Sequence, residues 1–180
     1  LQAKYAGRLM NHSADSLFRH RIELIPNCGH SIDYSLTTPW LKTYKRNPYP
    51  HTFMWEDYPM DGQRRQGFYN LYVMKRPKAA DGLKDASGED RDYYEMDIQD
   101  NVIRLSVKKV TYQTLERDPV YGIDLKFTKS NHPVIGGKWK IYLNDQLVDM
   151  NRPVTVFIND RKAFEGKLVP RMEDMITSCM

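Results

Sequence analysis

The residue whose surroundings most clearly suggest chemistry is His30. It follows a short apolar segment, residues 22–25, and a tight loop that ends in Gly29-His30. A histidine on an exposed loop can take a proton from a nucleophile and return it to a leaving group, which is general acid–base catalysis. Gly29 would let the backbone turn sharply enough to aim the imidazole. His30 is therefore a candidate catalytic base.

The elements around His30 would have to position it. Residues 2–18 carry apolar side chains at helical spacing, and residues 21–25 are expected to form a buried strand. Thr38-Pro39 predicts the start of a second helix, with Thr38 as N-cap and Pro39 in the first helical position. Asn47-Pro48 should end it, because the residue before proline avoids the helical region. The pattern is helix, strand, loop and helix, with His30 in the loop.

From Tyr49 onward the pattern changes to the period of two that is typical of strands. Near Lys108-Lys109 the apolar residues change from odd to even positions, which predicts a bulge or a turn there. Asn159-Asp160 predicts a hairpin turn. Residues 77–92 are expected to form a long loop, and the last residues from 170 onward a helix. Short strands separated by turns indicate a β-sandwich. They are expected at residues 52–57, 66–75, 93–98, 102–115, 123–127, 139–143, 154–158 and 163–168.

Bulk properties exclude several classes of function. With 41% hydrophobic and 28% charged residues, the 180-residue chain has the composition of an ordinary folded protein. The formal net charge is only +4 and basic residues form no stripe, so nucleic-acid binding is not expected. No apolar run approaches the length of a bilayer crossing, so no membrane partner is expected either. Cys28 and Cys179 suggest no disulfide framework, and whether they pair is left open.

Two stretches carry a resemblance to a known family. The first comprises Pro-Asn-Cys-Gly-His at residues 26–30, Thr-Pro-Trp-Leu at 38–41 and Arg-Asn-Pro-Tyr-Pro at 46–50; the second is residues 147–159. Together they resemble the C-terminal part of bacterial secreted esterases of the α/β-hydrolase superfamily, similar to polyester-depolymerase-like and dienelactone-hydrolase-like proteins. Some members of that family carry a small β-sandwich after the catalytic histidine.

The resemblance implies a mainly β chain in two parts. Residues 1–47 would be the helix–strand–helix remnant of an α/β-hydrolase domain, and residues 48–180 an immunoglobulin-like β-sandwich that ends in a helix. The parent protein would be a serine carboxylic-ester hydrolase that acts through an acyl-enzyme, in the periplasm or outside the cell.

The family's catalytic triad follows the chain order serine, acid, histidine. His30 would be the triad base of the parent, but the chain contains no Gly-x-Ser-x-Gly, and the acid would precede residue 1. The chain alone is therefore expected to be inactive, without a cofactor or a metal. Its expected partner is the missing catalytic domain of the parent, which would act on an ester or an esterified carbohydrate. Apolar surface left exposed on residues 1–47 would favour a homodimer.

Other residues with possible chemistry have simpler interpretations. Asp33 suits a loop or cap residue better than an orienting acid, and Cys28 suits a small buried thiol. The remaining histidines, His12, His20, His51 and His132, show no metal-ligand spacing. A calcium site is less expected than a solvated loop at Asp81, Asp85, Glu89, Asp90 and Asp92.

Aromatic side chains on the strands leave a second class of function open. Half of them should face the core and half should face out. If they gather on the outside beside a groove, the β domain would be a self-contained binding module for a carbohydrate or a protein; otherwise it could be a structural spacer. The candidates are Trp55, Tyr58, Phe68, Tyr69, Tyr72, Tyr93, Tyr94, Trp139 and Tyr142.

Overall fold

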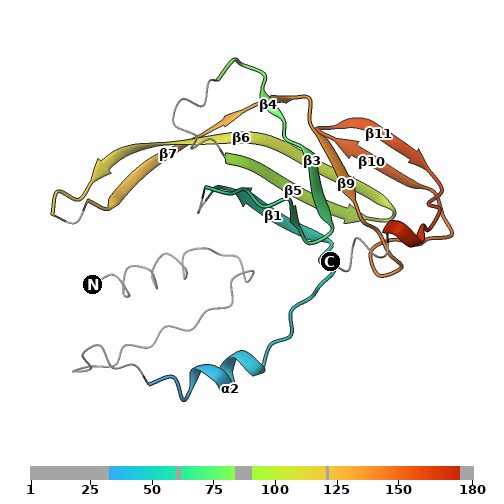
Figure 1. Ribbon diagram of the computed structural model, residues 1–180, viewed down its shortest axis with the longest axis horizontal. Coiled ribbons are helices and arrows are strands. Elements are labelled where there is room, and N and C mark those ends of the chain that lie inside the picture. The colour runs from blue at the N-terminus through green and yellow to red at the C-terminus, as the bar shows by residue number, and fades with distance from the viewer. Residues whose placement is uncertain (1–32, 60–61, 84–90, 121, 175–180) are drawn as a thin grey trace. The chain divides into compact units, whose positions relative to one another are not determined.

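A computed structural model describes residues 33–59, 62–83, 91–120 and 122–174 (Figure 1). The chain divides into two compact units, residues 1–46 and residues 47–180. In the described part of the first unit, α2 spans Thr37–Lys42. The second unit is mainly β, with eleven strands among the described residues.

The start of α2 differs from the prediction. Leu36 occupies the N-cap position and Thr38 makes no capping hydrogen bond, so Pro39 is the third helical residue instead of the first. Proline is tolerated there because the first backbone N–H groups of a helix have no partner within the helix. The helix ends at Lys42, before Asn47-Pro48 is reached, and the Thr43 hydroxyl donates a hydrogen bond to the Trp40 carbonyl at 2.6 Å.

A six-stranded mixed sheet forms the larger layer of the second unit (Figure 1). β6 is the central strand, and β10 runs parallel to it while the other neighbouring pairs are antiparallel. In space the order is β1, β5, β6, β10 and β11, with β7 paired to the far half of β6. The strands are β1 (Thr52–Asp57), β5 (Arg91–Gln99), β6 (Val102–Arg117), β7 (Asp124–His132), β10 (Val154–Ile158) and β11 (Arg161–Gly166).

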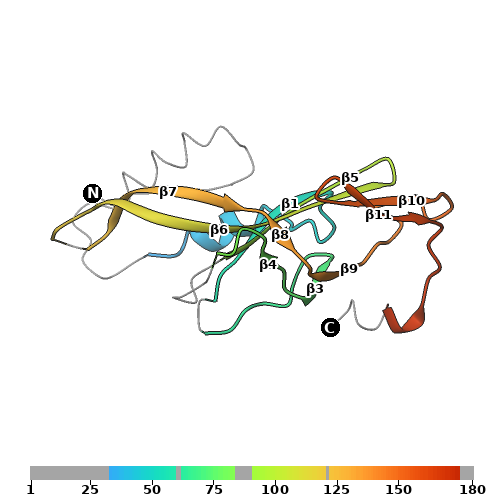
Figure 2. The same ribbon diagram turned by 90° about the horizontal axis from the view of Figure 1, so that it is seen from above.

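Two smaller sheets complete the second unit. The order β2, β3, β9 forms one, and β4 pairs with β8 in the other. Figure 2 shows β3 and β9 on one side of the large sheet. The strands are β2 (Gly67–Phe68), β3 (Leu71–Lys75), β4 (Lys78–Ala79), β8 (Val134–Ile135) and β9 (Lys138–Ile141).

The two larger sheets share one hydrophobic core. Alternate residues of β1, β5 and β6 point to the same face, where they meet Leu71 and Val73 of β3. Aromatic rings connect the layers: Trp55 stacks on Phe68 at 5.6 Å and on Tyr94 at 5.1 Å between ring centroids. The buried side chains contributed by the large sheet are Phe53, Trp55, Tyr94, Met96, Ile98, Ile103, Leu105, Val107 and Val154.

The predicted break at Lys108-Lys109 was wrong. β6 continues through these residues in unbroken register with β5, from Val102 opposite Gln99 to Val110 opposite Arg91. Lys109 lies at an inward-facing position where the alternation predicts an apolar residue. It is tolerated there because its ammonium group pairs with the buried carboxylate of Asp92. The irregular register lies further along, around Leu115, which has no partner on β7.

Asparagine residues join the turns of the large sheet to distant segments. The turn between β10 and β11 is at Asn159-Asp160, as predicted, and both residues have positive φ angles. The Asn159 side chain also pairs with the backbone of Val107, accepting from its N–H at 2.7 Å and donating to its carbonyl at 3.0 Å. Asn101, in the turn between β5 and β6, exchanges two hydrogen bonds of 2.8 Å with the Asp149 backbone. The Asn159 side chain thus replaces ladder bonds at Val107, where β6 has neither β10 nor β7 beside it.

Candidate functional site

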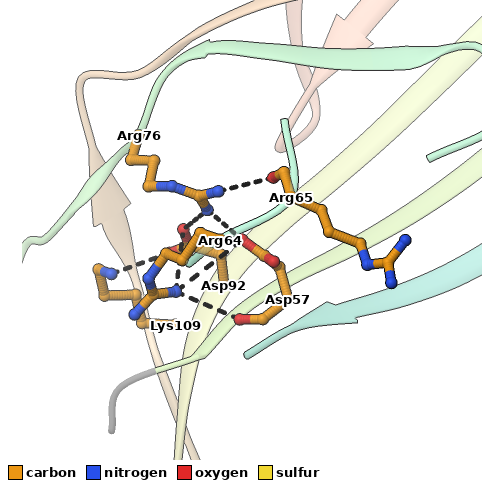
Figure 3. A network of polar contacts seen from close by, with 6 residues as sticks. All are labelled: Asp57, Arg64, Arg65, Arg76, Asp92 and Lys109. Atoms are coloured by element: carbon orange, nitrogen blue, oxygen red, sulfur yellow. Dashed lines mark hydrogen bonds and ion pairs between the residues drawn. The ribbon is translucent and has the colours of Figure 1, made fainter. Parts of the chain in front are cut away.

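Asp57 and Asp92, the two most buried polar residues of the described chain, lie together with three cations in a charge cluster (Figure 3). The register of the large sheet creates it, because Asp57 of β1 lies opposite Asp92 of β5, and Asp92 lies opposite Lys109 of β6. Two carboxylates in directly opposed positions repel each other unless cations lie between them. Arg76, just after β3, and Arg64, before β2, supply cations from the other side of the core.

Short ion pairs hold this charge cluster, which we define as Asp57, Arg64, Arg76, Asp92 and Lys109. Arg76 Nη1 lies 2.7 Å from Asp92 Oδ2 and also contacts Asp57 Oδ2, so one guanidinium bridges the two acids. Lys109 Nζ lies 2.8 Å from the other oxygen of Asp92. Arg64 Nη1 donates to the Asp57 carbonyl at 3.2 Å and lies 3.8 Å from Asp92 Oδ2. Both carboxylates are thus matched by cations.

The electrostatics of the charge cluster favour a structural role. Burial by itself would lower the pKa of Arg76, but its hydrogen bond to Asp92 and the charges of Asp57 and Asp92 raise that pKa above its ordinary value. Burial also raises the pKa of the neighbouring Tyr94 phenol, which stays neutral. The ion pairs of Arg76 with Asp57 and Asp92 join the two sheets.

A second group of charged and aromatic side chains lies on the opposite, outward face of the large sheet. Glu56 is at its centre and accepts hydrogen bonds from Arg91 Nη1 at 2.6 Å, from the Tyr112 hydroxyl at 2.7 Å and from Lys129 Nζ at 3.3 Å. Each residue belongs to a different strand, β1, β5, β6 or β7, so this group spans four neighbouring strands.

Cations cover the tyrosine rings of this outward group. The Arg91 guanidinium lies 4.4 Å from the centroid of Tyr58 and 4.6 Å from that of Tyr112. Lys129 Nζ lies 4.3 Å from the centroid of Tyr93. These distances allow cation–π attraction. We call the six residues Glu56, Tyr58, Arg91, Tyr93, Tyr112 and Lys129 the cation–aromatic cluster.

The hydrogen bonds at Glu56 shift several pKa values. Partial burial would raise the pKa of Glu56, but the bonds from Arg91, Tyr112 and Lys129 hold it below its ordinary value. Burial likewise opposes the charge on Lys129, whereas its bonds to Tyr112 and Glu56 raise its pKa. Burial and the bond to Glu56 raise the pKa of Tyr112. The carboxylate and the ammonium are therefore both charged at neutral pH.

An open groove of about 400 Å³ lies at the end of β1, next to the cation–aromatic cluster. It is lined by Trp55, Glu56, Asp57, Tyr58, Arg65 and Arg91. Two arginines from different parts of the chain border this groove together with an aromatic ring. The lining also carries the carboxylates of Glu56 and Asp57, and Arg91 already binds Glu56 at 2.6 Å. Arg65 is therefore the arginine of this lining that suits a ligand with an acidic group, because guanidinium groups bind carboxylates through paired hydrogen bonds.

His132 connects three segments through its two ring nitrogens. Nδ1 lies 2.7 Å from Asp81 Oδ2, in the loop after β4, and Nε2 lies 2.9 Å from the Thr111 hydroxyl on β6. The bond to His132 lowers the pKa of Asp81. An acid, a histidine and a hydroxyl in series also occur in hydrolase triads, but here the hydroxyl belongs to a threonine within a strand. We interpret the arrangement as a tether that holds the loop after β4 against the sheet.

Several residues that the sequence suggested fall outside the described part of the chain. These are His12, His20, Cys28, His30, Asp85, Glu89, Asp90 and Cys179. Asp33 is described and exposed; it accepts hydrogen bonds from the backbone and the hydroxyl of Ser35, at 2.8 and 3.0 Å, and so belongs to a turn before α2. No group of three or more potential ligands among the described residues could hold a metal ion.

One prediction about the acidic loop was wrong. Asp92 is completely buried in β5 instead of solvated, because Arg76 and Lys109 compensate its charge. Sequence reasoning also missed Asp57 and Lys109, although their positions carried a signal. Both occupy positions that the alternation along their strands places on the inward face. A charged side chain at such a position is buried and therefore needs an opposite charge nearby.

Comparisons with family models, with curated proteins and with solved structures found no match to this chain. Among the described residues, no helix combines the length and the apolar character needed to cross a membrane.

We expect Asp92→Asn to lower the free energy of unfolding by about 3 kcal/mol, because it leaves Lys109 buried beside an uncharged amide. Lys109→Met should cost less, since Arg76 still neutralises Asp92. The matched control is Lys162→Met, which breaks the exposed pair with Glu165 and should leave the free energy of unfolding almost unchanged. Urea denaturation measures all three. Equal effects of Asp92→Asn and Lys162→Met would contradict the structural role of the charge cluster.

The lowered pKa of Glu56 predicts a stability that depends on pH. A carboxylate whose folded pKa lies below its unfolded value of about 4.5 stabilises the fold above that value, and this contribution is lost as the pH falls through the folded pKa. Glu56→Gln should therefore reduce the loss of stability between about pH 5 and pH 3, and Tyr112→Phe should do so in part. Denaturation at a series of pH values tests this. An unchanged slope in Glu56→Gln would refute it.

Proposed function

We propose that the chain is the non-catalytic C-terminal part of a serine carboxylic-ester hydrolase. Its β domain would act as an accessory or docking domain for the catalytic domain. His30 would serve as the triad base of the parent protein only, and the location would be periplasmic or extracellular, as for the secreted esterases that the sequence resembles. The observation that carries this proposal is the set of motifs at residues 26–30, 38–41, 46–50 and 147–159.

Features of the described β domain support an accessory role. The two carboxylates that come together in its core are both bound by cations, and they connect the sheets. Glu56, the acid at the centre of the outward face, accepts three hydrogen bonds from cations and a phenol. A domain whose charges pair in this way is suited to rigidity and recognition.

The finer description of the fold is also a proposal. An immunoglobulin-like sandwich in residues 48–180 is supported by two sheets that enclose one core and by their mainly antiparallel pairing. A C-terminal helix is supported by helical backbone from Met172 to Asp174. In residues 1–47, α2 would be the last helix of the hydrolase domain.

Extension of the chain at its N-terminus tests this proposal. A protein that includes the natural upstream coding region should hydrolyse p-nitrophenyl butyrate, and His30→Ala should reduce kcat at least about 10³-fold, because the serine then has no base. His132→Ala is the matched control and should leave kcat unchanged. An active extended protein that is insensitive to His30→Ala would disprove the assignment of His30.

A second candidate function is a self-contained binding module, and one observation favours it. Tyr58, Tyr93 and Tyr112 gather on the outward face beside the groove at the end of β1. Since cations already lie over these rings, a sugar would have to displace them before it could stack. Arg65 in the groove lining favours an acidic partner, such as a protein segment rich in carboxylates, whereas Arg91 already binds Glu56.

If the β domain is such a module, poly-L-glutamate should bind to it more tightly than neutral cellohexaose does. Arg65→Ala should weaken binding of poly-L-glutamate roughly tenfold, because it removes a charge-assisted hydrogen bond. Arg161→Ala, an exposed arginine on β11, is the control and should have little effect. Affinity electrophoresis compares the variants. Equal weakening by both variants would show only nonspecific attraction to a basic protein.

A further inference from the structure

The last part of β6 and its partner β7 form an arm that extends from the rest of the large sheet (Figure 1). Among the described residues, pairing of β6 with β5 reaches Val110 opposite Arg91, whereas β6 continues to Arg117. We call residues 111–117 of β6 together with β7 the arm. Figure 2 shows it extending away from β10 and β11. Beyond Val110 the described sheet is only two strands wide.

The arm exposes apolar side chains that a two-stranded ribbon cannot cover. Leu115, Leu125 and Phe127 are 55%, 46% and 57% exposed. The Tyr112 ring packs on Phe127 with centroids 5.4 Å apart, which shields only part of it. A two-stranded ribbon is marginally stable in water, and further strands with a shared apolar face are needed for independent stability.

β7 offers an open edge for such strands. Along its nine residues it pairs only with β6, and within the described part of the chain its other side presents backbone groups without a strand partner. An unprotected edge with apolar side chains is a template for another strand. The occupant that fits should therefore be extended, and should carry apolar residues that alternate with polar ones.

We propose that the occupant is β7 of a second copy of this chain, paired antiparallel across a twofold axis. The dimer would contain a continuous four-stranded ribbon, β6–β7–β7–β6, in the region where each arm alone has two strands. Such an isologous contact needs a strand that is complementary to itself. The sequence of β7 meets that condition.

Charge favours this self-pairing. The arm together with residues 118–123, which connect its two strands in sequence, carries three acidic and three basic side chains, so residues 111–132 are neutral although the chain is formally +4. An axis through Thr128 places Asp124 opposite His132 of the second copy, and an axis through Phe127 places Lys126 opposite Thr128. Neither alignment opposes like charges, whereas an axis through Lys126 places two lysines opposite each other and is disfavoured.

Sedimentation equilibrium of the full chain tests the proposal. The unaltered chain should form a dimer, and Leu125→Lys combined with Phe127→Lys should raise its dissociation constant roughly tenfold or more. Val169→Lys, at an exposed apolar position outside the arm, should leave the dissociation constant unchanged. A chain that remains monomeric at high concentration overturns the proposal, and a different protein would then be the expected binding partner of the arm. A dimer that persists in the double variant also overturns it, and would point to residues 1–47 instead.

Single cysteines provide a test that does not depend on weakening the arm. In a background with Cys28→Ser and Cys179→Ser, Phe127→Cys or Thr128→Cys should form a disulfide-linked dimer on mild oxidation, because residues on the twofold axis face their own copies. The control is Thr52→Cys on β1, the outer strand next to β5, and this variant should stay monomeric. Failure of both arm variants to cross-link, in protein with an unaltered circular dichroism spectrum, contradicts the proposed pairing.

Discussion

The repulsion between Asp57 and Asp92 is the constraint around which the β domain is organised. The register of β1 on β5 places the two carboxylates opposite each other, inside a core that excludes water. Only cations within direct reach can offset that repulsion, and Arg76 reaches them from beyond β3. Arg76 therefore connects the position of the small sheet to the register of the large sheet. Hydrophobic burial drives the two layers together, and the charge cluster specifies their alignment.

β6 is the second organising feature, because it has different partners along its length. β5 lies on one side of it up to Val110, while β10 and then β7 lie on the other. Between these two partners the Asn159 side chain completes the ladder at Val107. The outward face of β6 supplies Tyr112 to the cation–aromatic cluster, and its inward face supplies Lys109 to the charge cluster. A single strand thus connects the core, the outward surface and the arm.

Local signals in the sequence predicted much of this fold. Alternation located β1, β5 and β10 to within a few residues, and Asn159-Asp160 marked its turn correctly, because these features depend on neighbouring residues. The parallel pairing of β6 with β10 has no local signal, since it joins segments far apart in the chain. Lys109 was misjudged for a related reason: its burial depends on Asp92 and Arg76, which only the tertiary structure brings close. The capping residue of α2 was misplaced because proline fits any position of a first helical turn.

The parallel pairing between β6 and β10, which we call the parallel seam, affects how the sheet folds and how it unfolds under force. β5, β6 and β7 follow one another along the chain and can pair as a meander soon after they are formed, whereas β10 must return from a distant part of the sequence. Only four residue pairs hold that seam, compared with nine between β5 and β6. The seam is therefore expected to close last during folding and to part first under force. The Asn159 side chain, which bonds the Val107 backbone at the end of the seam, stabilises this pairing.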